Sequence, residues 1–276
     1  NASDELQQFV DATGIPFLTT PQGRGVISDD HPRSFLAARN MAFQNSDVML
    51  FLGTRFNYVI SHGQPPRFNP DAKVLQVNAD PAEIGKGRPV DVGIVGDAKT
   101  VLRQMLDLVQ GKFDPRKETP WISALREQDL KGQARLEPFL NSDEVPIHPL
   151  RLCKEIGDFL DRDSILVVDG QEILNYGRQS ISTYVPGHRL NSGVFGTMGV
   201  GVPFGLGAKA AKPDKQVLVL HGDGSFGMNA MEMDTAVRHN LPVVTVISLN
   251  GGWTADPEGG KIGRDLGYKR YEKMMD

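Results

Sequence analysis

The sequence predicts an α/β protein made of two doubly wound domains, each with a parallel sheet. Continuous apolar runs such as "DVMLFL" and "QVLVL" are typical of strands that are buried on both faces. These runs alternate with segments of helical periodicity, as expected for strands joined by helices that cover the sheet. Many of the 30 glycines stand at predicted strand–helix junctions, where the chain must turn tightly.

Length and composition narrow the class of protein. The 276 residues suffice for two domains, and a charged fraction of 23% suits a globular protein. A net charge of −4 gives no basic field for nucleic acid or a membrane surface, and no apolar run reaches membrane-spanning length. The single cysteine, Cys153, fits a reducing compartment such as the cytoplasm, and it is interpreted as a buried apolar residue rather than a nucleophile.

The first predicted domain covers residues 1–112. Its opening helix has Ser3 as N-cap and Gly14 as stop, and a later helix has Pro32 near its first turn. Strands are predicted at residues 15–20, 47–54, 73–80 and 92–97, and the other helices at 32–46 and 98–111. Residues 113–147 are polar and proline-interrupted, which predicts a linker with one helix near Trp121 to Arg135.

The second predicted domain covers residues 148–276. Strands are predicted at residues 164–170, 216–224 and 243–250, helices at 148–160, 199–212 and 225–239, and a helix or turn at 172–181. Residues 266–276 have the pattern of a helix cut off within a domain. We therefore interpret the chain as a piece of a longer polypeptide whose second domain is incomplete at its C-terminus.

The most informative stretch is "GDGSFGMNAMEMDTAVRHNLPVVTVISLNGG", residues 222–252. Asp223 follows one predicted strand and Asn250 the next, so both are expected at the edge of the sheet where α/β proteins bind ligands. Gly222 and Gly224 let the turn approach a ligand, and Ser225 is predicted to cap the helix. By itself the Asp-Gly pair could be a simple turn.

The same stretch contains oxygen ligands that suit Mg²⁺ or Ca²⁺. The carboxylate of Asp223, the amide oxygen of Asn250 and a backbone carbonyl near Gly252 are hard donors, and Mg²⁺ normally completes its octahedron with phosphate oxygens and water. The stretch therefore predicts a metal-bridged diphosphate.

This stretch resembles the cofactor-binding motif of thiamine diphosphate enzymes, which begins with Gly-Asp-Gly and closes with Asn at about this distance. The resemblance implies that Asp223, Asn250 and the carbonyl of Gly252 hold Mg²⁺. It places the backbone N–H groups of Gly224 and Ser225 against the diphosphate of the cofactor. Gly222 and Gln171 are also expected to contact the cofactor.

A second segment, "NSGVFGTMGVGVPFGLGAKAA" at residues 191–211, resembles the pyrimidine-binding turn of the same family. The resemblance implies that Met198 holds the cofactor in its bent form and that its N–H meets a ring nitrogen. The carbonyl of Gly196 would accept the 4′-amino group of the cofactor. Taken alone, Met198 could equally be a core residue.

The resemblance covers essentially the whole chain. The first domain is similar to the family's Rossmann-like central domain and the second to its thiamine diphosphate-binding domain. The segments "IPFLTTPQGRGVISDDHP" and "GTRFNYVISHG" most resemble the acyl-CoA branch, meaning 2-hydroxyacyl-CoA lyases and oxalyl-CoA decarboxylases. Acetolactate synthases and 2-oxoacid decarboxylases are the alternative enzymes, and a fragment that binds cofactor or nucleotide without turnover is the alternative that is not an enzyme.

The acyl-CoA branch implies reversible cleavage of a 2-hydroxyacyl-CoA to formyl-CoA and an aldehyde or ketone. Arg55 and Arg189 are candidate clamps for the phosphates of coenzyme A, or else solvated surface residues. Glu172 stands where this branch is expected to have Asn, and it could move a proton or be a solvated residue at a helix start. Trp253 could shape a substrate pocket or fill the core.

The family resemblance also implies partners. A homo-oligomer, dimer or tetramer, is expected because the cofactor of these enzymes lies between subunits, and an ADP-like nucleotide could bind the first domain. The glutamate that activates the aminopyrimidine lies in an N-terminal domain of the family, to which nothing in these 276 residues is similar. The chain by itself is therefore expected to be catalytically inert.

Overall fold

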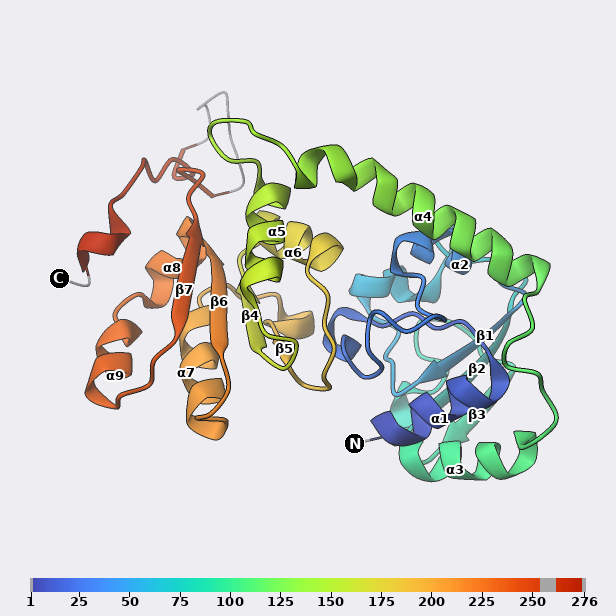
Figure 1. Cartoon of the computed structure of the whole chain (residues 1–276). Coiled ribbons are helices and arrows are strands. Elements are labelled where there is room, and N and C mark those ends of the chain that lie inside the picture. Colours follow the sequence, from blue (N-terminus) through green and yellow to red (C-terminus); the bar gives the residue numbers. More distant parts are fainter. Residues whose placement is uncertain (1, 254–261, 275–276) are drawn as a thin grey trace. The chain divides into compact units, whose positions relative to one another are not determined.

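The computed structural model describes residues 2–253 and 262–274. The chain divides into two compact units, residues 1–136 and 137–276, and each unit has its own parallel sheet with helices around it (Figure 1). The predicted α/β class with parallel sheets is therefore confirmed. The units are described one at a time below.

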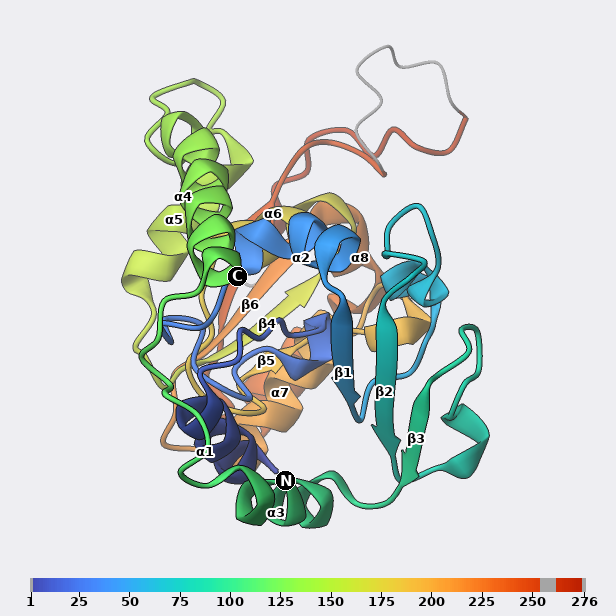
Figure 2. The same cartoon turned by 90° about the vertical axis from the view of Figure 1, so that its right-hand side faces the viewer.

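The sheet of the first unit has three parallel strands in the order β1-β2-β3, which Figure 2 shows side by side. They are β1 (Val48–Leu52), β2 (Lys73–Asn78) and β3 (Val92–Val95). The helices are α1 (Ser3–Thr13), α2 (Arg39–Asn45) and α3 (Ala98–Val109), with short 3₁₀ turns between. Helix α1 ends as predicted at Gly14, which takes the left-handed conformation with φ 69°.

Three local predictions for this unit are wrong. Ser3 is the first residue of α1 rather than its N-cap, which is Ala2. Residues 15–20 form no strand beyond an isolated bridge between Phe17 and Ser34. Residues 32–35 do not join a helix, and the carbonyl of Arg33 accepts the N–H of Phe17 (3.0 Å) from another segment. The helical residues begin only with a 3₁₀ turn at Leu36–Ala38, before α2.

Helix α4 (Pro120–Leu140) is longer than the linker helix that the sequence predicts. It continues five residues beyond Arg135 in spite of Pro138 in its last turn. Inside the first unit, α4 is fixed by the carboxylate of Asp129, which accepts the N–H of Ala37 (2.7 Å). Among the described residues no helix is both long enough and apolar enough to cross a membrane.

The sheet of the second unit has four parallel strands in the order β5-β4-β6-β7. They are β4 (Ile165–Asp169), β5 (Arg189–Leu190), β6 (Val217–Gly222) and β7 (Val244–Ser248). The central strands β4 and β6 are almost wholly buried, as predicted. Strands at the edges, such as β3 and β7, are instead largely half-buried or exposed, because a neighbour covers them on one side only.

Helices cover both faces of this sheet (Figure 1). One core includes residues of α5 (Pro149–Phe159) and α6 (Glu172–Ser180), and Cys153 lies fully buried in it. Burial raises the pKa of the Cys153 thiol to about 11, so the interpretation as an apolar core residue is confirmed. The other core includes residues of α7 (Gly201–Ala211), α8 (Asp223–Asn229) and α9 (Glu232–Arg238).

Two helix predictions for this unit are wrong. The helix predicted at 225–239 is two shorter helices, α8 and α9. The first of them ends at Asn229, whose side chain donates to the carbonyl of Gly199 (2.6 Å). Of residues 266–276, those that the structure describes form only a 3₁₀ turn at Tyr271–Met274, and the N–H of Leu266 pairs with the carbonyl of Gly251 (2.9 Å).

A buried polar group lies within the apolar strand β6. The imidazole of His221 is only 1% exposed, with Nδ1 3.2 Å from Ser225 Oγ and 3.7 Å from Asp169 Oδ2. The ring fits directly under Gly201, where a Cβ would lie 2.1 Å from His221 Cε1. Burial lowers the pKa of His221 from 6.5 to about 4, so the imidazole is neutral at neutral pH.

We expect His221 to make the stability of this unit depend on pH. Between the folded pKa of about 4 and the ordinary value of 6.5, the unfolded chain holds the proton and the folded chain does not. The free energy of unfolding therefore falls by about 2 kcal/mol from about pH 7 to about pH 5. Urea unfolding followed by circular dichroism should show this loss, and His221→Leu should remove it.

Substitution of the exposed His239 by Gln provides the control and should leave the pH dependence in place. Asp169 acts with the opposite sign, because burial raises its pKa and the folded chain then binds more protons just above pH 3.8. Its contribution remains in the His221→Leu chain, so the comparison isolates the histidine. Equal pH dependence in the His221→Leu and unsubstituted chains would contradict this assignment.

Candidate functional site

Three parallel strands of the second unit end at one edge of the sheet. Because β4, β6 and β7 are neighbours in that order, the residues that follow them are brought together. Asp223 follows β6 and Asn250 lies just beyond β7, which is the arrangement that the sequence predicts for these two residues. Glu172, at the start of α6, follows β4.

The carboxylate of Asp223 joins the ends of β6 and β7. It is 1% exposed, Oδ1 accepts the N–H of Gly224 (2.7 Å), and Oδ2 accepts the N–H of Gly251 (2.7 Å). The Gly224 N–H, expected to face a diphosphate, is thus directed at Asp223 in this structure. A role for this N–H toward a cofactor stays a prediction.

The turn after β6 is held by a hydroxyl group. Ser225 is 1% exposed and lies inside the first turn of α8, where its Oγ donates to the carbonyl of Gly222 (2.9 Å). The prediction that Ser225 caps the helix is wrong, because α8 already begins at Asp223 and Gly222 is the residue before it. Ser225 stabilises the glycine turn instead.

Asn250 is fixed at both ends of its amide. Nδ2 donates to Glu172 Oε2 (2.8 Å), and Oδ1 accepts the N–H of Gly252 (3.3 Å). Gln171, which precedes Glu172, is exposed at the start of α6. No pattern in the sequence predicts that Glu172 and Asn250 are bonded.

The turn that contains Met198 is tied to the same edge of the sheet. Gly201 N–H donates to Asp169 Oδ2 (2.8 Å) at the end of β4, and Asn229 of α8 donates to the carbonyl of Gly199 (2.6 Å). Met198 is half-buried, and Gly196 is exposed in the left-handed conformation with φ 67°. Sequence reasoning missed Asp169, although "VVDG" repeats the pattern of an acid and a glycine after a buried strand.

Trp253 lies over the turn after β6. A Cβ added to Gly224 would be 2.9 Å from Trp253 Nε1, so only glycine at position 224 leaves room for the indole. The indole is 36% exposed and is therefore not a fully buried core residue. The structure places Trp253 against the glycine turn of Asp223, and its role toward a substrate stays a prediction.

The two candidate phosphate clamps differ. Arg189 is 3% exposed, and Nη1 donates to the carbonyl of Ile181 (2.9 Å). The expectation that it anchors a substrate phosphate, or lies solvated on the surface, is contradicted, because β5 pairs with β4 and turns the guanidinium inward. Arg55 is exposed in the loop after β1 of the first unit and can still meet a ligand.

The oxygen donors predicted at this edge would suit a cation that also has ligands from outside the protein. In residues 2–253 and 262–274, no three His, Cys, Asp or Glu side chains are grouped closely enough to hold a metal ion. One carboxylate, one amide and one carbonyl, from Asp223, Asn250 and Gly252, are an incomplete set for Mg²⁺. Phosphate oxygens and water commonly complete such a set.

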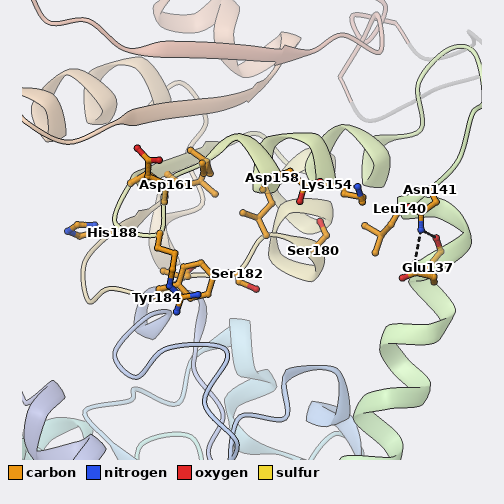
Figure 3. Close-up of a pocket in the computed structure, with 17 residues that line it drawn as sticks. Glu137, Leu140, Asn141, Lys154, Asp158, Asp161, Ser180, Ser182, Tyr184 and His188 are labelled. Carbon is orange, nitrogen blue, oxygen red and sulfur yellow. Dashed lines mark hydrogen bonds and ion pairs between the residues drawn. The ribbon is translucent and has the colours of Figure 1, made fainter.

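A separate hollow of about 230 Å³ lies at the opposite edge of the same sheet (Figure 3). Its lining includes Asp161, Arg162 and Ser164, which precede β4, and Tyr184, over whose ring the Arg162 guanidinium lies at 3.8 Å. Because it adjoins the amino end of β4, this hollow is distinct from the site of Asp223.

Two family models match this sequence. Residues 1–105 match the central domain of thiamine pyrophosphate enzymes, and residues 174–256 match their C-terminal TPP binding domain. The second match begins within α6 and extends past Trp253, and it therefore contains Asp223, Asn250 and the Met198 turn but not Glu172.

Curated relatives agree with these matches. A 2-hydroxyacyl-CoA lyase of Oryza sativa subsp. japonica is 37% identical over 91% of this chain and 44% of its own length. Oxalyl-CoA decarboxylase of Escherichia coli (strain K12) is 33% identical over 100% of this chain and 50% of its own length. A probable acetolactate synthase of Mycobacterium bovis is 34% identical over 92% and 45%.

The chain spans about half the length of these relatives. Their sequences nevertheless cover nearly all of it, across both structural units. The domain matches, the similarity to the lyase and the decarboxylase, and the convergence of Asp223 with Asn250 agree with one another. The chain belongs to the thiamine pyrophosphate enzymes, and it carries their central domain and their TPP-binding domain.

Proposed function

We propose that this chain holds thiamine diphosphate through Mg²⁺ at the strand ends of its second unit. We further propose that the whole protein cleaves the carbon–carbon bond of a 2-hydroxyacyl-CoA to give formyl-CoA and an aldehyde or ketone. The observation that carries the proposal is the convergence of Asp223, Asn250 and the Met198 turn at one edge of the sheet.

Each part of the site has a role in this proposal. Asp223, Asn250 and the carbonyl of Gly252 hold the metal, and Asp223 supplies the one formal negative charge among them. Thiamine diphosphate, when bound, supplies a thiazolium carbon nucleophile and an electron sink for cleavage beside a carbonyl. Met198 and the carbonyl of Gly196 orient the pyrimidine ring.

The surroundings keep these groups in place. The indole of Trp253 covers the Gly224 turn and shields its backbone from water. The hydroxyl of Ser225 holds the turn after β6, and the carboxylate of Asp169 holds the turn that contains Met198. A site supported in this way can hold reacting groups in one geometry, which is a main source of catalytic rate.

The first unit is proposed to bind the nucleotide part of coenzyme A, or a separate ADP-like nucleotide. Gly53 follows β1 with φ 62°, and no atom lies within 4 Å of a Cβ built there, so the end of this strand is open. Arg55 stands two residues further on and is the remaining candidate for a phosphate contact. The same proposal includes assembly of the protein into a homodimer or homotetramer.

Oxalyl-CoA decarboxylase activity is the second candidate. The similarity to a decarboxylase of that name covers the whole of this chain, so both activities fit the same site. Assays of the full-length protein with formyl-CoA and ketones, with oxalyl-CoA and with pyruvate test the proposal. Turnover of pyruvate alone would overturn it in favour of an acetolactate synthase or 2-oxoacid decarboxylase.

Asp223→Ala should abolish Mg²⁺-dependent binding of thiamine diphosphate. The substitution removes the only charged ligand and leaves the N–H groups of Gly224 and Gly251 without their acceptor. Calorimetric titration of the chain with thiamine diphosphate and Mg²⁺ measures the effect.

Asp223→Asn keeps the shape of the side chain and removes its charge. It should also bind thiamine diphosphate poorly, because the expected loss comes from the metal contact and not from misfolding. Asp234→Ala, which removes an exposed carboxylate from α9, should bind like the unsubstituted chain. Normal affinity in Asp223→Ala would refute the metal assignment.

Met198→Ala should retain most cofactor binding and lose about 10²-fold in turnover. The metal and diphosphate contacts remain, but a misplacement of the reactive carbon by about 1 Å can have a cost of this size. Rate and cofactor affinity are compared in the full-length protein. Met231→Ala, which truncates a more exposed methionine just before α9, is the control, and unchanged turnover in Met198→Ala would contradict its role.

Pantetheine thioesters should react more slowly than full coenzyme A thioesters. Binding energy from the nucleotide, far from the reacting carbon, can raise the rate of the chemical step. Arg55→Ala should lower the specificity constant for the full thioester about tenfold, as for the loss of one charged hydrogen bond, and leave the pantetheine substrate unaffected. Arg116→Ala, another exposed arginine of this unit, is the control.

A further inference from the structure

We propose that Glu172 is a positioning residue that sets the orientation of the Asn250 amide. In this role it presents the amide oxygen Oδ1, rather than the NH₂ group, to the metal ion. This inference rests on the proposed function, and it assigns to Glu172 a role other than proton transfer or simple solvation.

The bond between the two residues depends on the strand order of the second unit. Glu172 begins α6 after β4, and Asn250 follows β7, which lies two strands away in the order β4-β6-β7. Their hydrogen bond of 2.8 Å therefore spans the end of β6, where Asp223 is located. The bond therefore links the residues that follow β4 and β7 across the end of β6, the strand that lies between them.

The chemistry of the pair fixes the direction of the amide. A carboxylate has only acceptors, whereas the two ends of an amide are an acceptor oxygen and a donor nitrogen. Glu172 Oε2 can therefore pair with Nδ2 of Asn250 and not with Oδ1. The oxygen must then face the other way, toward the backbone of Gly252, whose N–H it accepts at 3.3 Å.

Without this contact only the long bond of 3.3 Å from the Gly252 N–H to Oδ1 would restrain the amide. Asn250 is exposed, so core packing does not fix its rotation. A rotation by half a turn would exchange Oδ1 and Nδ2 and direct an NH₂ group, which cannot bind a cation, at the metal position. The Glu172 contact removes that alternative.

The hydrogen bond can be separated from the charge of Glu172. Among the described residues, the hydrogen bonds of the Glu172 and Asp223 carboxylates come from an amide NH₂ and from backbone N–H groups, so both formal negative charges lie near this edge. Glutamine at position 172 would remove one charge and keep an oxygen acceptor for Nδ2, but its own NH₂ group could also pair with Oδ1 of a turned amide, so it should orient Asn250 less strictly than glutamate does. Alanine would remove both the charge and the acceptor.

The first measurement concerns the free chain. In its ¹H–¹⁵N NMR spectrum, the side-chain NH₂ signal of Asn250 is identified by its absence in Asn250→Ala. Glu172→Ala should move this signal toward the position of a solvated amide, and Glu172→Gln should move it less. An unmoved signal in Glu172→Ala would overturn the orienting contact whether or not any cofactor binds.

The second measurement is the affinity for Mg²⁺ in the presence of thiamine diphosphate, by calorimetry. Glu172→Ala should weaken it about tenfold, as is typical when a residue that orients a metal ligand is lost. Glu172→Gln should stay closer to the unsubstituted chain. In the Asn250→Ala background, Glu172→Ala should have no further effect, because there is no amide left to orient.

Glu232→Ala is the matched control, because Glu232 is also a half-buried glutamate at the first residue of a helix of this unit. Equal losses in Glu172→Ala and Glu172→Gln that persist in the Asn250→Ala background would show an effect of charge and would overturn the inference. Normal affinity in Glu172→Ala would overturn it and leave the proposed function standing. Absence of binding by the unsubstituted chain would overturn both.

Discussion

The buried carboxylate of Asp223 joins the turn after β6 to the turn after β7, and the geometry of the site depends on it. Each of its oxygens accepts one backbone N–H, from Gly224 and from Gly251, at 2.7 Å. A buried charge is tolerated only when such partners replace the lost water. Because the register pairs Gly222 with Ser248, the two turns begin at the same level of the sheet, and one side chain can reach both.

The neighbouring strand β4 also has an acid at its end that holds a turn. Asp169 is the last residue of β4, and its carboxylate accepts the N–H of Gly201 at the start of α7. One acid therefore holds the turn of Met198, and the other holds the turn of Asn250. His221 lies in the core beside Asp169 and contacts Ser225 of the glycine turn. The sheet thus fixes both turns with respect to one another inside a single unit.

The sequence could predict six of the seven described strands and the meeting of Asp223 with Asn250, because apolar runs and parallel neighbours determine both, but it missed the two-residue strand β5 and wrongly placed a strand at residues 15–20. It could not predict the bond of Glu172 to Asn250, since these residues lie 78 positions apart and meet only through the order of the strands. For a related reason, the sequence does not predict the burial of Arg189. Its short polar segment looks exposed until β5 pairs with β4 and buries the guanidinium. The predicted N-cap role of Ser225 is wrong because α8 begins two residues before it, at Asp223.

Two glycines of α7, Gly201 and Gly205, are required by packing against β6. A Cβ on Gly201 would lie 2.1 Å from the His221 ring, and a Cβ on Gly205 would lie 2.5 Å from Val219 Cγ2. Both contacts are with β6, so α7 needs glycine at these positions to lie close to that strand. This close approach also lets Gly201 reach Asp169 at the end of β4. These two glycines therefore serve to bring the Met198 turn to the edge of the sheet where Asp223 is located.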